Sequence, residues 1–139
     1  RHMFTALCLA ALDPARRTVE LANAGVCPPM LRRGGEVTEL ESPGPSLPLG
    51  AFPATAYGSR EVALEPGDVL VLFTDGMPEA PDRAGAEYGY DALRAFLAAL
   101  PAETLTAAAI RQALVDEIAR FARGSRRQDD MTLVVVKAL

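Results

Sequence analysis

Two acidic motifs stand at the ends of apolar, strand-like runs, where a carboxylate can reach the rim of a packed sheet. In the first motif, the apolar run 69–73 leads to Asp75. In the second, Asp129 and Asp130 come shortly before the apolar run 133–136. Carboxylate oxygens are the ligands that hard cations such as Mg²⁺ and Mn²⁺ prefer. If the two rims meet, the pattern predicts metal-assisted hydrolysis.

The charge and the histidine content exclude several other classes of function. The net charge of -4 and the isoelectric point near 5.0 argue against a nucleic-acid binder, which needs a basic face. The single histidine, His2, stands at the N-terminus, so a Ser-His-Asp triad has no candidate base. Arg123, Arg126 and Arg127 form a tight group beside the second acidic motif. This group is either a solvated helix end favoured by the helix dipole or a rim that attracts phosphate.

The two cysteines, Cys8 and Cys27, lie far apart among apolar neighbours and form no C-x-x-C pair. A disulfide-stabilised scaffold would carry more cysteines, so both are expected to be buried thiols in a reducing compartment. The chain has no apolar run of membrane-spanning length and no signal-peptide pattern. We therefore expect a cytoplasmic protein with no membrane insertion.

Apolar periodicity predicts mainly antiparallel strands, with two helices late in the chain. Alternating or continuous apolar segments indicate strands at 4–12, 18–24, 30–33, 36–40, 59–64, 69–74 and 131–137. Apolar residues at helical spacing indicate helices at 90–99 and 105–123, the second capped by Thr104 or Thr106 and ended by Gly124. This order predicts an α+β fold, with antiparallel β-sheets flanked by helices.

Residues 41–58 are the least regular part of the chain. Four prolines and two glycines between Pro43 and Pro53 exclude regular secondary structure there. This segment is either a plain surface connection or a loop that borders the site. Asp68, which follows Pro66-Gly67, is expected to serve the turn that precedes the run 69–73.

A series of short motifs, in order and with sensible gaps, carries a family resemblance. The motifs are Asn23-Ala24-Gly25 with Pro28-Pro29, Pro48-Leu49-Gly50, Pro66-Gly67-Asp68, Thr74-Asp75-Gly76 with Glu79-Ala80, and Asp129-Asp130-Met131-Thr132. Together they resemble the PPM family of metal-dependent, type 2C Ser/Thr protein phosphatases, and within it the SpoIIE- and RsbU-like bacterial branch. One departure is Val26, which stands where this branch usually has histidine.

The resemblance implies an αββα sandwich of which residues 1–139 are the C-terminal portion of a single domain. The early Gly-Asp motif of the family, which supplies a carboxylate that bridges two metal ions, is absent from these residues. We therefore expect a partial domain that is inactive on its own. A sheet edge left open in this way would favour a homodimer.

The same resemblance assigns roles to individual residues. Asp75 and Asp129 are implied to be the catalytic metal ligands, and Gly76 can offer its backbone carbonyl. Two ions, Mn²⁺ or Mg²⁺, are implied for the complete domain. Asp130 is expected to orient loop backbone or a metal-bound water. Glu79 is expected either to fix the loop after Asp75 or to be an exposed carboxylate at a helix start.

The function implied is hydrolysis of phosphoserine or phosphothreonine by a water that two metal ions activate. The resemblance implies that the substrate is a phosphorylated bacterial regulator of the anti-sigma factor antagonist type, in a partner-switching pathway that controls a sigma factor. The alternative is a non-catalytic binding or signalling domain that keeps the fold and has lost its metals.

Overall fold

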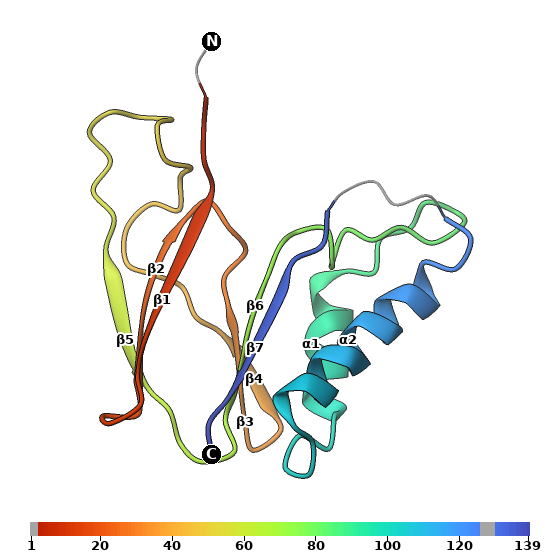
Figure 1. Ribbon diagram of the computed structural model, residues 1–139. Helices are drawn as coiled ribbons and strands as arrows, with labels where there is room; N and C mark the ends of the chain where they lie inside the picture. The colour runs from red at the N-terminus through yellow and green to blue at the C-terminus, as the bar shows by residue number, and fades with distance from the viewer. Residues whose placement is uncertain (1–2, 126–129) are drawn as a thin grey trace.

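The computed structural model describes residues 3–125 and 130–139, which fold into two antiparallel sheets and two helices (Figure 1). The first sheet has the order β1 (Leu7–Asp13), β2 (Thr18–Ala24), β5 (Ser59–Ala63). The second has the order β4 (Glu36–Glu39), β3 (Met30–Arg33), β6 (Val69–Phe73), β7 (Leu133–Lys137). The helices are α1 (Tyr90–Ala99) and α2 (Ala107–Phe121). The expected α+β fold is confirmed.

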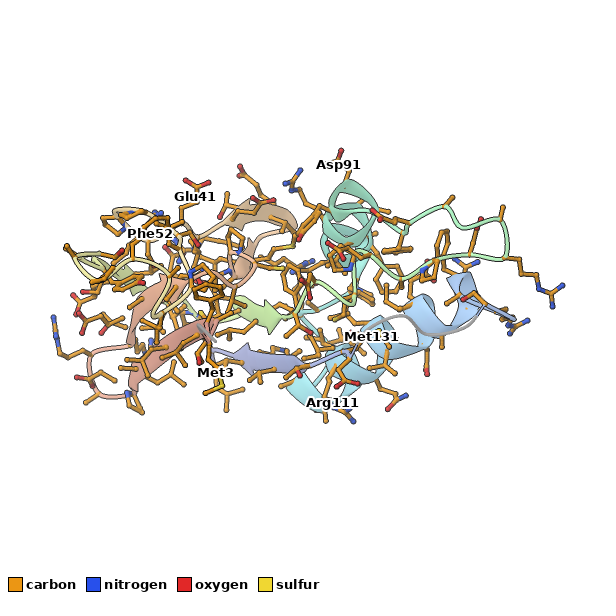
Figure 2. The ribbon with its side chains drawn as sticks, turned by 90° about the horizontal axis from the view of Figure 1, so that it is seen from above. Met3, Glu41, Phe52, Asp91, Arg111 and Met131 are labelled. Atoms are coloured by element: carbon orange, nitrogen blue, oxygen red, sulfur yellow. The ribbon has the colours of Figure 1, made fainter. Side chains whose placement is uncertain are left out.

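The elements form three layers, because strand β6 is apolar on both of its faces. Val69, Val71 and Phe73 pack against the helices, whereas Leu70 contributes to the core between the sheets. Viewed from above, both helices lie at one end of the molecule, and Met3 and Phe52 lie at the other (Figure 2). Because residues of β6 belong to both hydrophobic cores, the end of this strand holds the first acidic motif in a fixed position.

Local sequence accounts for the turns and helix ends. Asp13 Oδ1 accepts a hydrogen bond from Arg16 N at 2.9 Å in the β1–β2 turn. Gly34 and Gly35 both have positive φ in the β3–β4 turn, as expected of a glycine pair there. Thr106 is the N-cap of α2, and its Oγ1 accepts from Ala109 N at 3.1 Å. Of the two caps that the sequence offered for this helix, Thr106 is therefore the one used.

Strand β1 begins later than expected and is an open edge. Residues 4–6 lie outside the strand, and Thr5 instead forms an isolated bridge to Leu49. Within residues 3–125 and 130–139, β1 pairs only with β2, and its Leu7, Leu9 and Leu12 are about half exposed. Among the described residues, no helix covers the outer face of this sheet (Figure 1). The open edge and the uncovered face leave a large apolar side-chain area of β1 in contact with solvent.

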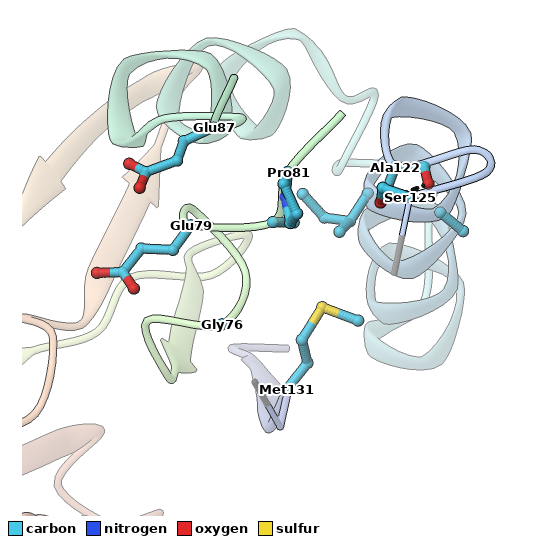
Figure 3. A pocket seen from close by; sticks show the side chains of 10 residues that line it. Gly76, Glu79, Pro81, Glu87, Ala122, Ser125 and Met131 are labelled. Atoms are coloured by element: carbon cyan, nitrogen blue, oxygen red, sulfur yellow. Dashed lines mark hydrogen bonds between the residues drawn. The ribbon is translucent and has the colours of Figure 1, made fainter. Parts of the chain in front are cut away.

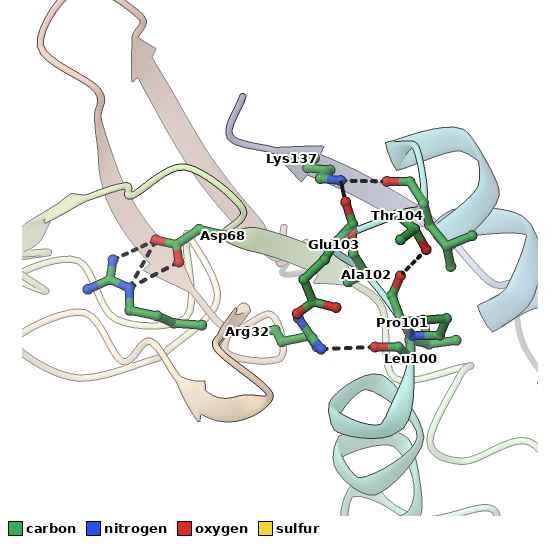
Figure 4. A network of polar contacts seen from close by, with 10 residues as sticks. Arg32, Asp68, Leu100, Pro101, Ala102, Glu103, Thr104 and Lys137 are labelled. Carbon is green, nitrogen blue, oxygen red and sulfur yellow. Dashed lines mark hydrogen bonds and ion pairs between the residues drawn. The ribbon is translucent and has the colours of Figure 1, made fainter.

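A polar network fixes the connection between the helices to the second sheet (Figure 4). Arg32, only 4% exposed, donates to Leu100 O at 2.9 Å and to Glu103 Oε1 at 3.0 Å. Lys137 Nζ donates to the carbonyls of Ala102 and Leu105 at 2.8 and 2.6 Å. These bonds satisfy carbonyls left free where the chain leaves α1 and enters α2.

Asp68 is in the expected turn but has a second role. Its Oδ2 accepts from Glu65 N at 2.8 Å, which closes the turn before β6. It is also 2% exposed and accepts from Arg33 Nη2 at 2.5 Å and Arg33 Nε at 3.0 Å (Figure 4). The carboxylate therefore joins the turn to β3, away from the acidic motifs.

None of the helices among the described residues is both long and apolar enough to cross a bilayer.

Candidate metal centre

The two acidic motifs meet because β6 and β7 are antiparallel neighbours. Phe73, the last residue of β6, pairs with Leu133, the first residue of β7. Beyond the strands, Thr74 N donates to Thr132 O at 3.1 Å, which extends the pairing by one step. Asp75 follows at once and is exposed. The carboxylate of the first motif thus stands at the sheet rim beside the second motif.

The side chain of Thr74 joins the two motifs directly. Its Oγ1 accepts from Thr132 N at 2.9 Å and donates to Asp130 O at 3.2 Å. A hydroxyl can do both at once, since it carries one proton and two lone pairs. Thr74 therefore fixes the backbone of the second motif against the end of β6.

Gly76 lets the two backbones approach closely. A Cβ placed on Gly76 would lie 2.6 Å from Asp130 O, which is closer than real Cβ atoms approach another atom, and 3.1 Å from Asp130 C. Only glycine fits there without a backbone shift. We refer to Thr74–Gly76 and Asp130–Thr132 together as the joined loops.

The predicted site residues take different places around the joined loops. Asp129 lies outside the described residues, as do Arg126 and Arg127, so their predicted roles stay predictions. Asp130 is exposed, and its carbonyl accepts from Thr74. Glu79 is exposed, and its backbone N donates to Asp75 O at 2.9 Å. This hydrogen bond closes a turn after Asp75.

A cavity of about 350 Å³ opens beside Asp75. Its other lining residues are Ala6, Gly25, Val26, Cys27, Ser46, Thr74, Glu79 and Tyr90. Because Ser46 belongs to the irregular segment 41–58, that segment borders this cavity, in line with the second of its two interpretations. We call this space the Asp75 cavity.

The Asn-Ala-Gly motif forms one wall of the Asp75 cavity. Asn23 Oδ1 accepts from Val26 N at 3.0 Å, and Asn23 Nδ2 donates to Val26 O at 2.8 Å, so one side chain closes the turn. Gly25 has φ +84°, and a Cβ there would lie 2.8 Å from Pro48. Motifs that are distant in the sequence are therefore neighbours at this wall.

A second cavity, of about 210 Å³, lies behind the loop 76–81 and against the end of α2 (Figure 3). Ile118, Ala122 and Met131 make much of its lining apolar. Glu79 lines both cavities, and its carboxylate points away from Met131 (Figure 3). This second space lies between the joined loops and the end of α2, and residues of both line it.

Cys27 and Tyr90 line the Asp75 cavity, although the sequence analysis gave neither a role. Cys27 Sγ lies 3.2 Å from Tyr90 Oη. Burial raises the pKa of the Cys27 thiol, and the carboxylates of Asp75 and Glu79 raise that pKa further. Burial, the contact with Cys27 and the same two carboxylates raise the pKa of Tyr90 well above its usual value. Both groups therefore stay protonated at neutral pH.

The expectation that both cysteines are buried was wrong. Cys8 and Cys27 are free thiols of intermediate exposure. Cys8 is on the edge strand β1, and Cys27 lines the Asp75 cavity. Apolar neighbours in the sequence did not reveal that these positions border open space.

The donor atoms at the joined loops suit a hard divalent cation, since they are carboxylate and carbonyl oxygens. Asp75 and the Gly76 carbonyl belong to one loop, and Asp130 belongs to the other. In residues 3–125 and 130–139, however, no three carboxylate, thiol or imidazole side chains come together closely enough to hold a metal ion. The described residues therefore do not form a complete metal-binding group by themselves.

Comparisons with known proteins identify the family of the chain. The family described as stage II sporulation protein E (SpoIIE) matches residues 1–139. Protein IcfG of Synechocystis sp. is 29% identical over 136 residues, which is 96% of this chain and 20% of that protein.

Two solved structures share the fold. One holds the PP2C phosphatase domain and a fragment of the regulatory domain of SpoIIE from Bacillus subtilis, with a TM-score of 0.77, 25% identity, and coverage of 95% of this chain and 37% of that one. The other holds the RsbU and RsbW domains of Rv1364c from Mycobacterium tuberculosis, with a TM-score of 0.73 and 26% identity. The match covers 95% of this chain and 35% of that one. The chain thus spans well under half the length of these relatives.

Proposed function

Because the chain belongs to the SpoIIE family, we propose that residues 1–139 are the C-terminal portion of a metal-dependent phosphatase domain. Its reaction is the hydrolysis of phosphoserine or phosphothreonine in a protein. The segment that completes the domain carries the Gly-Asp motif that the chain lacks. We call the two parts together the complete domain.

One observation carries this proposal, namely the contact between the joined loops. Thr74 Oγ1 bonds to both Asp130 O and Thr132 N, at 3.2 and 2.9 Å, and Gly76 leaves room for no Cβ against Asp130. These contacts bring the backbone of the second acidic motif beside the residue before Asp75. Support for metal binding is that oxygen ligands of both acidic motifs would then lie at the same rim of the sheet.

When bound, divalent cations would supply an activated water and would offset negative charge on the phosphoryl group. The chain's own residues supply the rest. Asp75, the Gly76 carbonyl and Asp129 would hold the cations. Asp130 would orient loop backbone or a metal-bound water, and Glu79 would fix the loop after Asp75. The Asp75 cavity admits the phosphorylated side chain, and its acidic lining favours phosphate only once cations are bound.

The proposed substrate is a phosphorylated regulator of the anti-sigma factor antagonist type. Support comes from the relative that joins an RsbU and an RsbW domain in one chain. The net charge of -4 makes nucleic acid an unsuitable partner.

The test is Mn²⁺-dependent release of phosphate from a phosphoserine peptide. We expect the complete domain to be active with Mn²⁺ or Mg²⁺ and inactive after chelation, and the 139-residue chain alone to be inactive. Robust turnover by this chain alone would refute the need for the completing segment. Binding of the phosphopeptide by the complete domain without any hydrolysis would favour the non-catalytic alternative.

A further inference from the structure

Tyr90 places a phenolic hydroxyl in the wall of the Asp75 cavity, where the metal ligands proposed above do not use it. It is the first residue of α1, and Gly89, with φ +88°, turns the chain into the helix at this point. Its ring lies 6.3 Å from that of Phe73, between centroids, at an interplanar angle of 53°. The hydroxyl therefore has a fixed position beside the loop that begins after Phe73.

The only hydrogen bond of this hydroxyl within the described residues is a weak one. Tyr90 Oη lies 3.2 Å from Cys27 Sγ, and either atom can be the donor. Sulfur is a poor donor and a poor acceptor compared with oxygen. An anionic oxygen in the cavity would be a far better partner for the phenol, because charge-assisted bonds are about twice as strong.

The surroundings keep the phenol in its donor form. Burial is the largest cause of the raised pKa of Tyr90, and the carboxylates of Glu79 and Asp75 add to it. Tyr90 is also 39% exposed, so a ligand in the cavity can reach the ring and the hydroxyl. A neutral donor beside acidic groups can bind an anion without the charge of a lysine or arginine.

We propose that Tyr90 is a substrate-binding residue whose hydroxyl exchanges Cys27 Sγ for a phosphoryl oxygen of the phosphorylated side chain bound beside Asp75. This inference rests on the proposed function and adds a residue from α1 to the site. It also gives Cys27 a role, because the thiol holds the hydroxyl in place until substrate arrives.

The test compares Tyr90→Phe with the unsubstituted complete domain in Mn²⁺. We expect KM to rise about tenfold for p-nitrophenyl phosphate and for a phosphoserine peptide alike, the effect of one charge-assisted hydrogen bond. Inorganic phosphate, measured by calorimetry, should bind about tenfold more weakly. Tyr57→Phe is the matched control, because Tyr57 donates to Pro48 O outside this cavity. The control should leave all three values unchanged.

Other outcomes would separate the two proposals. If the unsubstituted domain is active but Tyr90→Phe leaves KM and phosphate affinity unchanged, the role of Tyr90 is refuted. An effect on the peptide alone would also refute it, because the hydroxyl would then contact the peptide and not the phosphate. If the unsubstituted domain has no Mn²⁺-dependent activity, the proposed function fails, and phosphate binding by calorimetry decides the role of Tyr90 on its own.

Discussion

Replacing Thr74 by valine removes the hydroxyl that joins the two acidic motifs while keeping the shape of the side chain. Two hydrogen bonds are lost, to Asp130 O at 3.2 Å and from Thr132 N at 2.9 Å. Each bond contributes about 0.5–1.5 kcal/mol to folding, so we expect the free energy of unfolding to fall by about 1–3 kcal/mol. Because the loops are then free to separate, we also expect Mn²⁺ affinity to fall by about tenfold or more.

The assay is calorimetric titration of Mn²⁺ into the complete domain, beside thermal unfolding without metal. Thr74→Ser is the matched control, because serine keeps the hydroxyl and loses only a methyl group. The serine variant should retain Mn²⁺ affinity within about twofold, since both hydrogen bonds remain. If Thr74→Val bound Mn²⁺ as tightly as the unsubstituted domain, the joined loops would not position the metal centre.

Three further predictions concern other parts of the chain. Asp68→Asn should lower the free energy of unfolding by about 1–3 kcal/mol, because it weakens the contact with Arg33. Denaturant unfolding should show this loss, and phosphate release should show that Mn²⁺-dependent turnover is retained. Loss of turnover at full stability would contradict the prediction. Burial and Glu117 raise the pKa of Tyr88 to about 12 in the folded state, from 10.0, so its stabilising contribution is complete below pH 10 and is lost as the pH approaches 12. Melting temperatures from pH 9 to 12 should thus fall less steeply for Tyr88→Phe, and parallel curves would refute this. The 139-residue chain alone should self-associate through β1, and Leu9→Lys should weaken this association; light scattering that shows a monomer for the unsubstituted chain at high concentration would contradict it.

Local sequence patterns were sufficient for most elements of the fold. The strands and helices follow apolar periodicity, and their ends follow residues with local effects, such as Gly34-Gly35 and Thr106. The start of β1 was placed too early, because Phe4 is apolar but Thr5 pairs with Leu49 of a distant loop. Apolar periodicity reports only on neighbouring residues, so it could not predict a pairing with a residue far away in the sequence.

The candidate site was only partly predictable, for a related reason. Asp75 and its neighbour Gly76 could be found because the motif is continuous in the sequence. Cys27 and Tyr90 could not, since they meet only when the loop after β2 approaches the start of α1. The pairing of Asp68 with Arg33 likewise depends on β3 lying beside β6. Side-chain contacts between separate elements follow from packing and have no signature in one sequence.

The most direct test of the account is the thermal stabilisation of the complete domain by Mn²⁺, with and without Asp75→Asn. At a metal concentration one hundred times Kd, binding to the folded state stabilises it by about 2.7 kcal/mol. We expect Asp75→Asn to abolish this rise in Tm and the phosphatase activity, while the Tm without metal stays equal or increases slightly, because like-charge repulsion is relieved. A variant that kept both the Mn²⁺-induced rise in Tm and the turnover would show that Asp75 is not a metal ligand.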